Sequence, residues 1–168
     1  MKPLKPLFII LLALSLVLPI SSVFGSSVMW SQTSGTEDAE MAYSLVQTSD
    51  GGYAIAGGGM AAGSSYNYWL VKIDRYGEEE WNQTYIGGTG SEWIKSVIET
   101  LAGGFALAGG GSLGAGIFDC WFVKTDEYGN AQWNRTYGGA EWDEAYSILE
   151  TSDRGYVLAG KTESFGGV

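Results

Sequence analysis

Residues 81–132 read WNQTYIGGTGSEWIKSVIETLAGGFALAGGGSLGAGIFDCWFVKTDEYGNAQ, and the chain on either side of them is written in the same pattern. The preceding copy opens at Trp30 and reads WSQTSGTEDAEMAYSLVQTSDGGYAIAGGGMAAGSSYNYWLVKIDRYGEEE. The following copy opens at Trp133 and reads WNRTYGGAEWDEAYSILETSDRGYVLAGKTESFGGV. A fixed period of about 50 residues predicts tandem structural repeats. We assign the repeats to residues 30–80, 81–132 and 133–168.

Each full copy divides into four short extended segments, which in the first copy are residues 41–48, 53–58, 66–74 and 79–85. Asp50-Gly51-Gly52 separates the first two segments, and such residues accept the backbone angles of a tight hairpin. Asp74 and Asp126 open the other short turns, which their side chains are expected to cap. The pattern predicts an all-β chain with four strands in each repeat.

The second segment of each copy predicts how the sheets pack. Phe105 and Leu107 alternate with Ala106 and Ala108, so one face is bulky and the other is small. Neither face is polar, and we therefore expect both to be covered by neighbouring sheets. Sheets of this kind stack as blades around the axis of a β-propeller. Ala106 should then be buried at a junction between blades.

The order of motifs resembles that of kelch-type propeller blades, in which a glycine pair ends one strand and a tryptophan follows the next. Ile73 and Thr125 depart from kelch, where tyrosine usually precedes the aspartate. The chain resembles more closely the secreted, poorly characterised repeat proteins of archaea and bacteria with WNxTYGG, SDGGYxLAG and WLVKTDxxGN motifs. Residues 133–139, 49–57 and 121–130 carry these motifs here. The resemblance implies a propeller and brings no particular activity.

The third copy stops where its third strand is expected, so the chain holds about 2.6 repeats as an incomplete open arc. Closed propellers have four to eight blades. We therefore expect further blades, from a longer reading frame or from other copies, to be needed for closure. Truncation is the interpretation that we favour.

Composition restricts the chemistry of the chain. Its net charge of -10 disfavours nucleic acid as a partner. It has no histidine, which removes the usual general base and the commonest transition-metal ligand. Cys120 is the only cysteine, so no intramolecular disulfide can form. We expect no catalytic residue, no resident cofactor and no transition metal.

Residues 1–25 have the layout of a secretory signal peptide, with Lys2 and Lys5 before an apolar run and small residues at its end. An uncleaved N-terminal membrane anchor is the alternative. Residues 26–168 would then form the exported repeat region, in a secreted or envelope-associated protein. Asn82 and Asn134 lie in N-glycosylation sequons at equivalent places of two repeats, and modification there requires a host with the machinery.

Acidic residues gather where one repeat leads into the next, and they include Glu92, Glu141 and Asp143. We interpret them as a solvated acidic rim, with calcium binding as a less favoured alternative. Trp93 and Trp142 belong to the same segments. These two rings either cap the gaps between blades or stack on a sugar ligand, and these five residues are the candidate binding residues.

The sequence favours a non-enzymatic module that binds a protein or glycan surface. The first alternative is a glycan-processing enzyme, which would need two carboxylates on either side of a substrate. The second alternative is a quinone-dependent dehydrogenase, because an Asp-x-x-Gly turn before tryptophan also recurs in those propellers.

Overall fold

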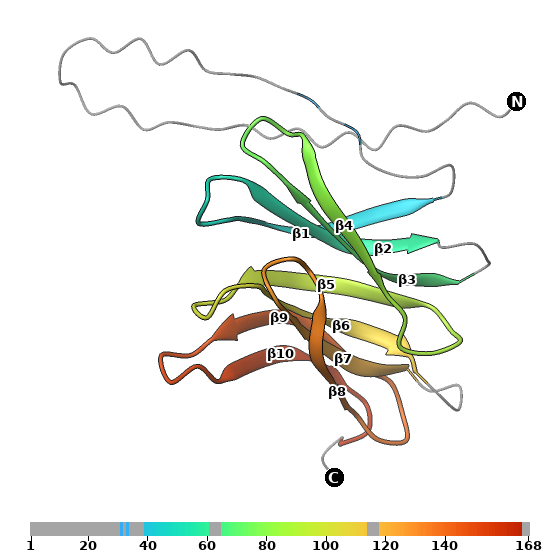
Figure 1. Ribbon diagram of the computed structural model, residues 1–168. Helices are drawn as coiled ribbons and strands as arrows, with labels where there is room; N and C mark the ends of the chain where they lie inside the picture. Colours follow the sequence, from blue (N-terminus) through green and yellow to red (C-terminus); the bar gives the residue numbers. More distant parts are fainter. Residues whose placement is uncertain (1–30, 32, 34–38, 61–64, 114–117, 166–168) are drawn as a thin grey trace, which may run out of the picture.

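The computed structural model describes residues 31, 33, 39–60, 65–113 and 118–165, which form strands and turns (Figure 1). No helix occurs among these residues, so the described part contains none that is long and apolar enough to cross a membrane. The predicted leader, residues 1–25, lies outside the described residues. The strands are β1 (Glu40–Gln47), β2 (Tyr53–Met60), β3 (Tyr66–Ile73), β4 (Glu79–Tyr85), β5 (Glu92–Glu99), β6 (Phe105–Ser112), β7 (Phe118–Thr125), β8 (Ala131–Tyr137), β9 (Asp143–Glu150) and β10 (Tyr156–Thr162).

These strands form three antiparallel sheets, in which neighbours in sequence are neighbours in space. The first sheet has the order β1-β2-β3-β4, the second sheet β5-β6-β7-β8, and the third sheet contains β9 and β10. The buried clusters place the three sheets in a stack, and Figure 1 shows the first sheet above the second. The prediction of an all-β chain with four strands in each complete repeat is confirmed, and the predicted strand ends agree within two residues.

Short turns of one design join the first two strands of each sheet. Thr48 donates its N–H to Gly52 and accepts the N–H of Gly51, and Thr100 and Thr151 repeat this pair of bonds. The third residue after the threonine has a positive φ, which is 88° at Gly51, 84° at Gly103 and 65° at Arg154. Glycine adopts this conformation without strain, whereas arginine does not.

The turns between the third and fourth strands are capped as expected. Asp74 Oδ1 accepts the N–H groups of Tyr76 and Glu78 at 2.8 and 2.9 Å. Asp126 Oδ1 accepts the equivalent pair, from Tyr128 and Asn130, at 3.0 and 2.8 Å. The two aspartates therefore hold the hairpins by their side chains.

A β-bulge lies at the same place in all three sheets and explains one glycine of each repeat. The register shifts between Ala42 and Ser44, and again at the equivalent residues of β5 and opposite Gly160 in β10. A Cβ atom at Gly160 would lie 1.9 Å from the carbonyl oxygen of Glu144. Gly57 and Gly109 have the same close approach, at 1.8 and 1.9 Å. The hairpin of β9 and β10 thus has the geometry of the complete sheets.

The small face of one sheet packs against the bulky face of the next. Ala54 and Ala56 of the first sheet share a buried cluster with Phe105, Leu107 and Trp121 of the second. Ala106 and Ala108 in turn share a cluster with Ala145 and Ile148 of the third sheet. Ala106 is fully buried, as the alternation of residue sizes predicted.

Glutamates at the ends of β5 and β9 add hydrogen bonds between neighbouring sheets. Glu99 Oε2, at the end of β5, accepts the N–H of Ser49 in the turn of the first sheet at 2.7 Å. Glu150, at the end of β9, accepts the N–H of Leu101 in the same way, also at 2.7 Å. The two junctions are therefore copies of one another.

Candidate functional site

One carboxylate of each repeat stands at the start of the first strand, at Glu40, Glu92 and Asp143. Glu92 and Asp143 are buried, with 0% and 3% of their surface exposed. The interpretation of these two residues as part of a solvated rim is therefore wrong. Glu92 Oε1 accepts the N–H of Gly88 at 2.8 Å, and Asp143 Oδ2 accepts that of Gly139 at 2.9 Å. Each carboxylate holds the glycine loop that precedes its own strand.

The surroundings of the two carboxylates shift their pKa values in opposite directions. Burial raises the pKa of Glu92, against the N–H groups of Gly87 and Gly88, which favour the charged form. Hydrogen bonds from the hydroxyls of Ser164 and Thr162, together with the N–H of Gly139, lower the pKa of Asp143. Asp143 is therefore ionised at neutral pH.

Asp119, on β7, is a second carboxylate beside Asp143 and was not among the residues predicted from the sequence. A Cβ atom at Gly138 would lie 2.1 Å from Asp119 Oδ1 and 2.8 Å from Asp143 Oδ2, so the two carboxylates flank this glycine. Burial and the charge of Asp143 raise the pKa of Asp119. The Oδ1 atoms of both residues are buried without a hydrogen-bond partner among the described residues.

Four aromatic rings form a row that runs from the first sheet, across the second sheet, to the residue before β9. Trp93 lies between Tyr66 and Phe118, at centroid distances of 6.0 and 5.6 Å. Phe118 also stacks on Trp142, at 4.3 Å and an interplanar angle of 20°. We call Tyr66, Trp93, Phe118 and Trp142 the aromatic row. Trp142 ends the row with 44% of its surface exposed, whereas Phe118 is buried.

The two candidate tryptophans differ in structural position. Trp93 is the second residue of β5, where the third sheet has Glu144, and it does not lie in a loop. Trp142 lies just before β9. Their placement together in loops outside the strands was therefore wrong for Trp93, although Phe118 brings both rings into one row. Lys95 Nζ lies 4.0 Å from the ring centroid of Tyr43 and 5.9 Å from that of Trp93. The ammonium group of Lys95 is therefore a cation beside the aromatic row.

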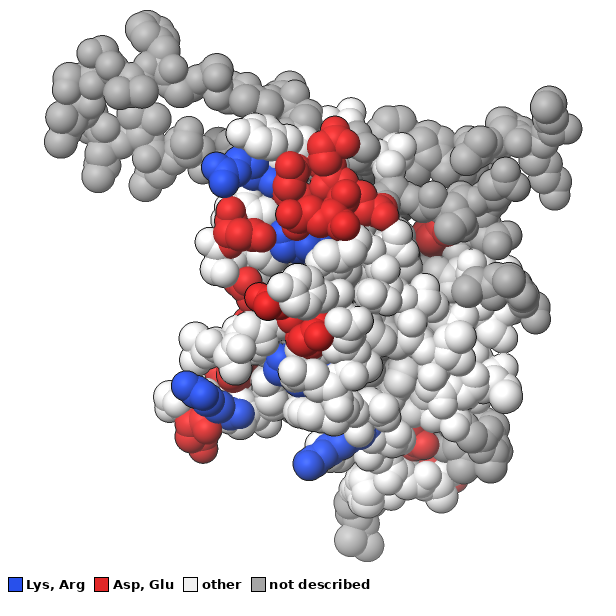
Figure 2. Space-filling model, viewed as in Figure 1, with Lys and Arg blue, Asp and Glu red and all other residues white. Residues whose placement is uncertain are grey.

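The remaining candidates lie at the surface. Glu141 is exposed, and its N–H donates to Ser164 Oγ at 3.0 Å. Asn82 on β4 and Asn134 on β8 are also exposed. Asn82 donates to Glu79 at 2.5 Å, and Asn134 accepts the indole N–H of Trp121 at 3.3 Å. Figure 2 shows acidic side chains gathered over the first sheet, where Glu78, Glu79 and Glu80 are exposed.

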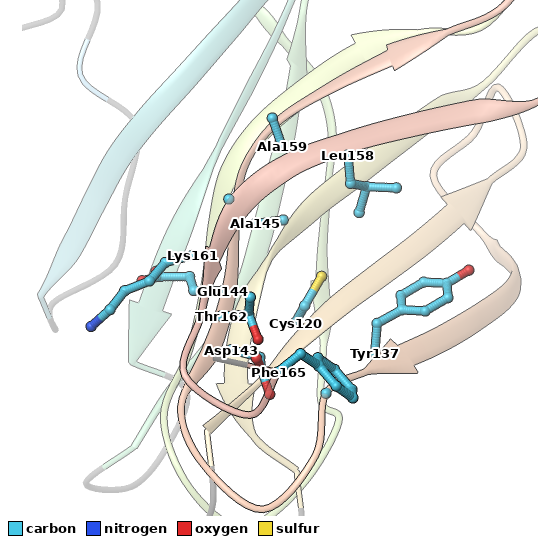
Figure 3. Close-up of a pocket in the computed structure, with 12 residues that line it drawn as sticks. Cys120, Tyr137, Asp143, Glu144, Ala145, Leu158, Ala159, Lys161, Thr162 and Phe165 are labelled. Atoms are coloured by element: carbon cyan, nitrogen blue, oxygen red, sulfur yellow. The ribbon is translucent and has the colours of Figure 1, made fainter. Parts of the chain in front are cut away.

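A pocket of about 220 Å³ opens between the second and third sheets (Figure 3). Cys120 of β7, Tyr137 of β8 and Leu158 of β10 contribute to its wall, and Asp143 lies at its edge. Burial raises the pKa of the Cys120 thiol to about 11, so this residue is a neutral apolar side chain at neutral pH. The wall of the pocket is mostly apolar, and Asp143 and Glu144 are its acidic residues.

The described residues contain no group of three or more His, Cys, Asp or Glu side chains arranged to hold a metal ion. Comparison with models of known protein families finds no family that matches the chain. A search of curated proteins likewise finds no match.

Proposed function

We propose that the chain is an exported, non-enzymatic binding module of the cell envelope, built from kelch-like propeller blades, and that the aromatic row contacts a glycan. Support for the blades comes from the repeated antiparallel sheets, each of which packs its bulky face on the small face of the preceding one. The four-strand sheets and their order match what such blades require.

The exposed ring of Trp142 is the observation that carries the proposal of a binding role. An indole held by stacking on Phe118 offers a rigid flat face, which suits the apolar face of a sugar ring. The carboxylate of Glu141 adjoins it in sequence and is exposed, so it can accept hydrogen bonds from sugar hydroxyls. Glu92 and Asp143, by contrast, are occupied with backbone N–H groups of their own loops.

A glycan array with the purified exported region, followed by titration of the glycans that bind, tests this proposal. Trp142→Ala should weaken binding about tenfold or more, as the loss of an aromatic anchor does. Tyr76→Ala is the control, because Tyr76 is 64% exposed and lies on the turn between β3 and β4. A wild-type chain that binds no glycan, or equal losses in the two variants, would refute the proposal. Binding to a protein in place of a glycan would also refute the glycan assignment.

A glycan-processing enzyme is the second candidate, and the pair of Asp119 and Asp143 is what favours it. One pKa is raised and the other lowered, which is the relation between a general acid and its partner carboxylate. Release of reducing ends from a bound polysaccharide, abolished in Asp119→Asn, would support this candidate. Binding without release would support the binding module.

A further inference from the structure

Strand β10 has an unoccupied edge in the described part of the chain. It is equivalent to β2 and β6, each of which pairs on both sides, yet β10 pairs with β9 alone among the described residues. Ala56 and Ala108 are fully buried, whereas the equivalent Ala159 is exposed. Val157 is 51% exposed where the complete sheets have a buried alanine. An open edge with apolar side chains is a template for a further strand.

The pocket beside this edge repeats the environment of Trp121. In the junction of the first two sheets, Trp121 is 4% exposed and packs in one cluster with Tyr68, Tyr85, Ile94 and Leu107. Its ring centroid lies 4.4 Å from that of Tyr68. Its backbone pairs with Gly109, and a Cβ atom at Gly87 would lie 3.0 Å from its ring. The binding site of this indole is thus formed by six residues: Tyr68, Tyr85, Gly87, Ile94, Leu107 and Gly109.

The pocket is lined by the equivalents of all six residues, one repeat further along the chain. They are Cys120, Tyr137, Gly138, Ala145, Leu158 and Gly160. Cys120 and Ala145 are smaller than Tyr68 and Ile94, so the pocket is wider than the site that holds the Trp121 ring. A dry cavity of about 150 Å³ is enough for benzene. The pocket's 220 Å³ therefore leaves room for an indole.

We propose that the edge of β10 and this pocket form a docking site for one further β-strand, of the β3 and β7 type, carried by another repeat of this kind. The two internal pairings fix its register. Ile55, Ala56 and Gly57 pair with Val71, Leu70 and Trp69, and the second sheet repeats this arrangement. The incoming strand thus places its tryptophan opposite Gly160 and its valine opposite Leu158. This inference does not depend on the aromatic row.

A synthetic peptide with the sequence of β3, YNYWLVKI, tests the site on the full exported region. Cys120 is the only cysteine and lines the pocket, so its alkylation rate reports occupancy directly. We expect the peptide to protect Cys120 and to slow amide exchange in β10. The exposed strand β8 is the internal control and should show no slowing.

Two control peptides separate strand addition from indole binding alone. Replacement of the peptide tryptophan by alanine should weaken binding about thirtyfold, which equals about 2 kcal/mol. N-methylation of the backbone along the edge that faces β10 should abolish the protection of β10 amides. Unchanged Cys120 alkylation at saturating peptide, equal protection by the alanine peptide, or equal slowing in β8 would overturn the proposal. None of these results bears on glycan binding at Trp142.

Discussion

Ser96 Oγ, on β5, accepts the backbone N–H of Ile148, on β9, at a distance of 3.3 Å. The same bond joins the first two sheets, where Ser44 Oγ accepts the N–H of Val97 at 3.2 Å. Both serines directly follow a β-bulge, which turns the hydroxyl toward the neighbouring sheet. In each junction, the bulge in one sheet therefore positions a serine that hydrogen-bonds to the backbone of the next sheet.

Replacement of this serine should loosen the junction. Ser96→Ala leaves the N–H of the buried Ile148 without its acceptor, and we expect a loss of about 1 kcal/mol in unfolding free energy. Denaturant unfolding measures it. Ser147→Ala is the matched control, because Ser147 holds the equivalent position on β9 and is exposed. Equal effects of the two substitutions would contradict this role of the hydroxyl.

Extra volume on the small face should also weaken the stack. Ala106 is fully buried between the second and third sheets, so Ala106→Leu should cost about 1–3 kcal/mol through overpacking. The control is Val157→Leu at the equivalent, half-exposed position of β10, which should be nearly neutral. A thermal melt of each variant decides the matter, and a tolerated leucine at position 106 would count against close stacking.

The turn between β9 and β10 contains a strained residue that glycine should relieve. Arg154 has a φ of 65°, where the other two repeats have glycine. Arg154→Gly should stabilise the chain by about 0.5–1 kcal/mol, because relief of left-handed strain exceeds the entropy cost of glycine. Gly103→Ala tests the reverse at a turn with open space around the Cβ position, and it should destabilise. Equilibrium unfolding of both variants should give opposite signs.

Asp119 gives the stability of the chain a defined pH dependence. Its pKa is raised by burial and by Asp143, so the folded state holds its proton more tightly than the unfolded state does. Stability should therefore fall as pH rises from the usual aspartate pKa through the raised value, and the deficit should persist at neutral pH. Asp119→Asn removes the charge and should stabilise the chain at neutral pH.

The first repeat provides the reverse test of this pH dependence. Asn67 is buried at the equivalent position of β3, and Asn67→Asp should destabilise the chain at neutral pH and less so in acid. Unfolding curves across the acidic range compare the slopes of the two variants with that of the wild-type chain. Identical slopes in Asp119→Asn and wild type would show that Asp119 titrates normally.

The sequence predicts the sheets better than the candidate site, for a physical reason. Strand positions follow from the alternation at Phe105–Leu107 and from the turn glycines, which are local signals. Whether Glu92 and Asp143 are buried or exposed depends on which backbone N–H groups of the preceding loop bind their carboxylates. The polarity of the neighbouring residues in the sequence does not predict these hydrogen bonds. One signal in the sequence does identify the two residues as equivalent. Each stands eight positions before the threonine that opens the hairpin turn of its repeat, Thr100 or Thr151.

The two tryptophans stand two positions apart in their repeats, which explains the error over them. Trp93 is the eighth residue after Tyr85 and Trp142 is the fifth after Tyr137, and the one extra residue of the second loop does not close that gap. Counted back from the hairpin turns, Trp93 corresponds to Glu144 and Trp142 to Ser91. Asp119 was missed because its partner, Asp143, is adjacent only once the second and third sheets stack.

The pairing of a small face with a bulky face gives the stack a polarity. Its two ends are different surfaces, so two copies cannot join through these faces by a twofold axis, which requires one patch to match itself. Growth by the small-on-bulky packing of the cluster that contains Ala56 and Trp121 is head-to-tail. Such an interface closes only if its rotation divides a full circle, and otherwise it continues as a filament. The angle between successive sheets, rather than the strength of their packing, therefore decides between a closed ring and a filament.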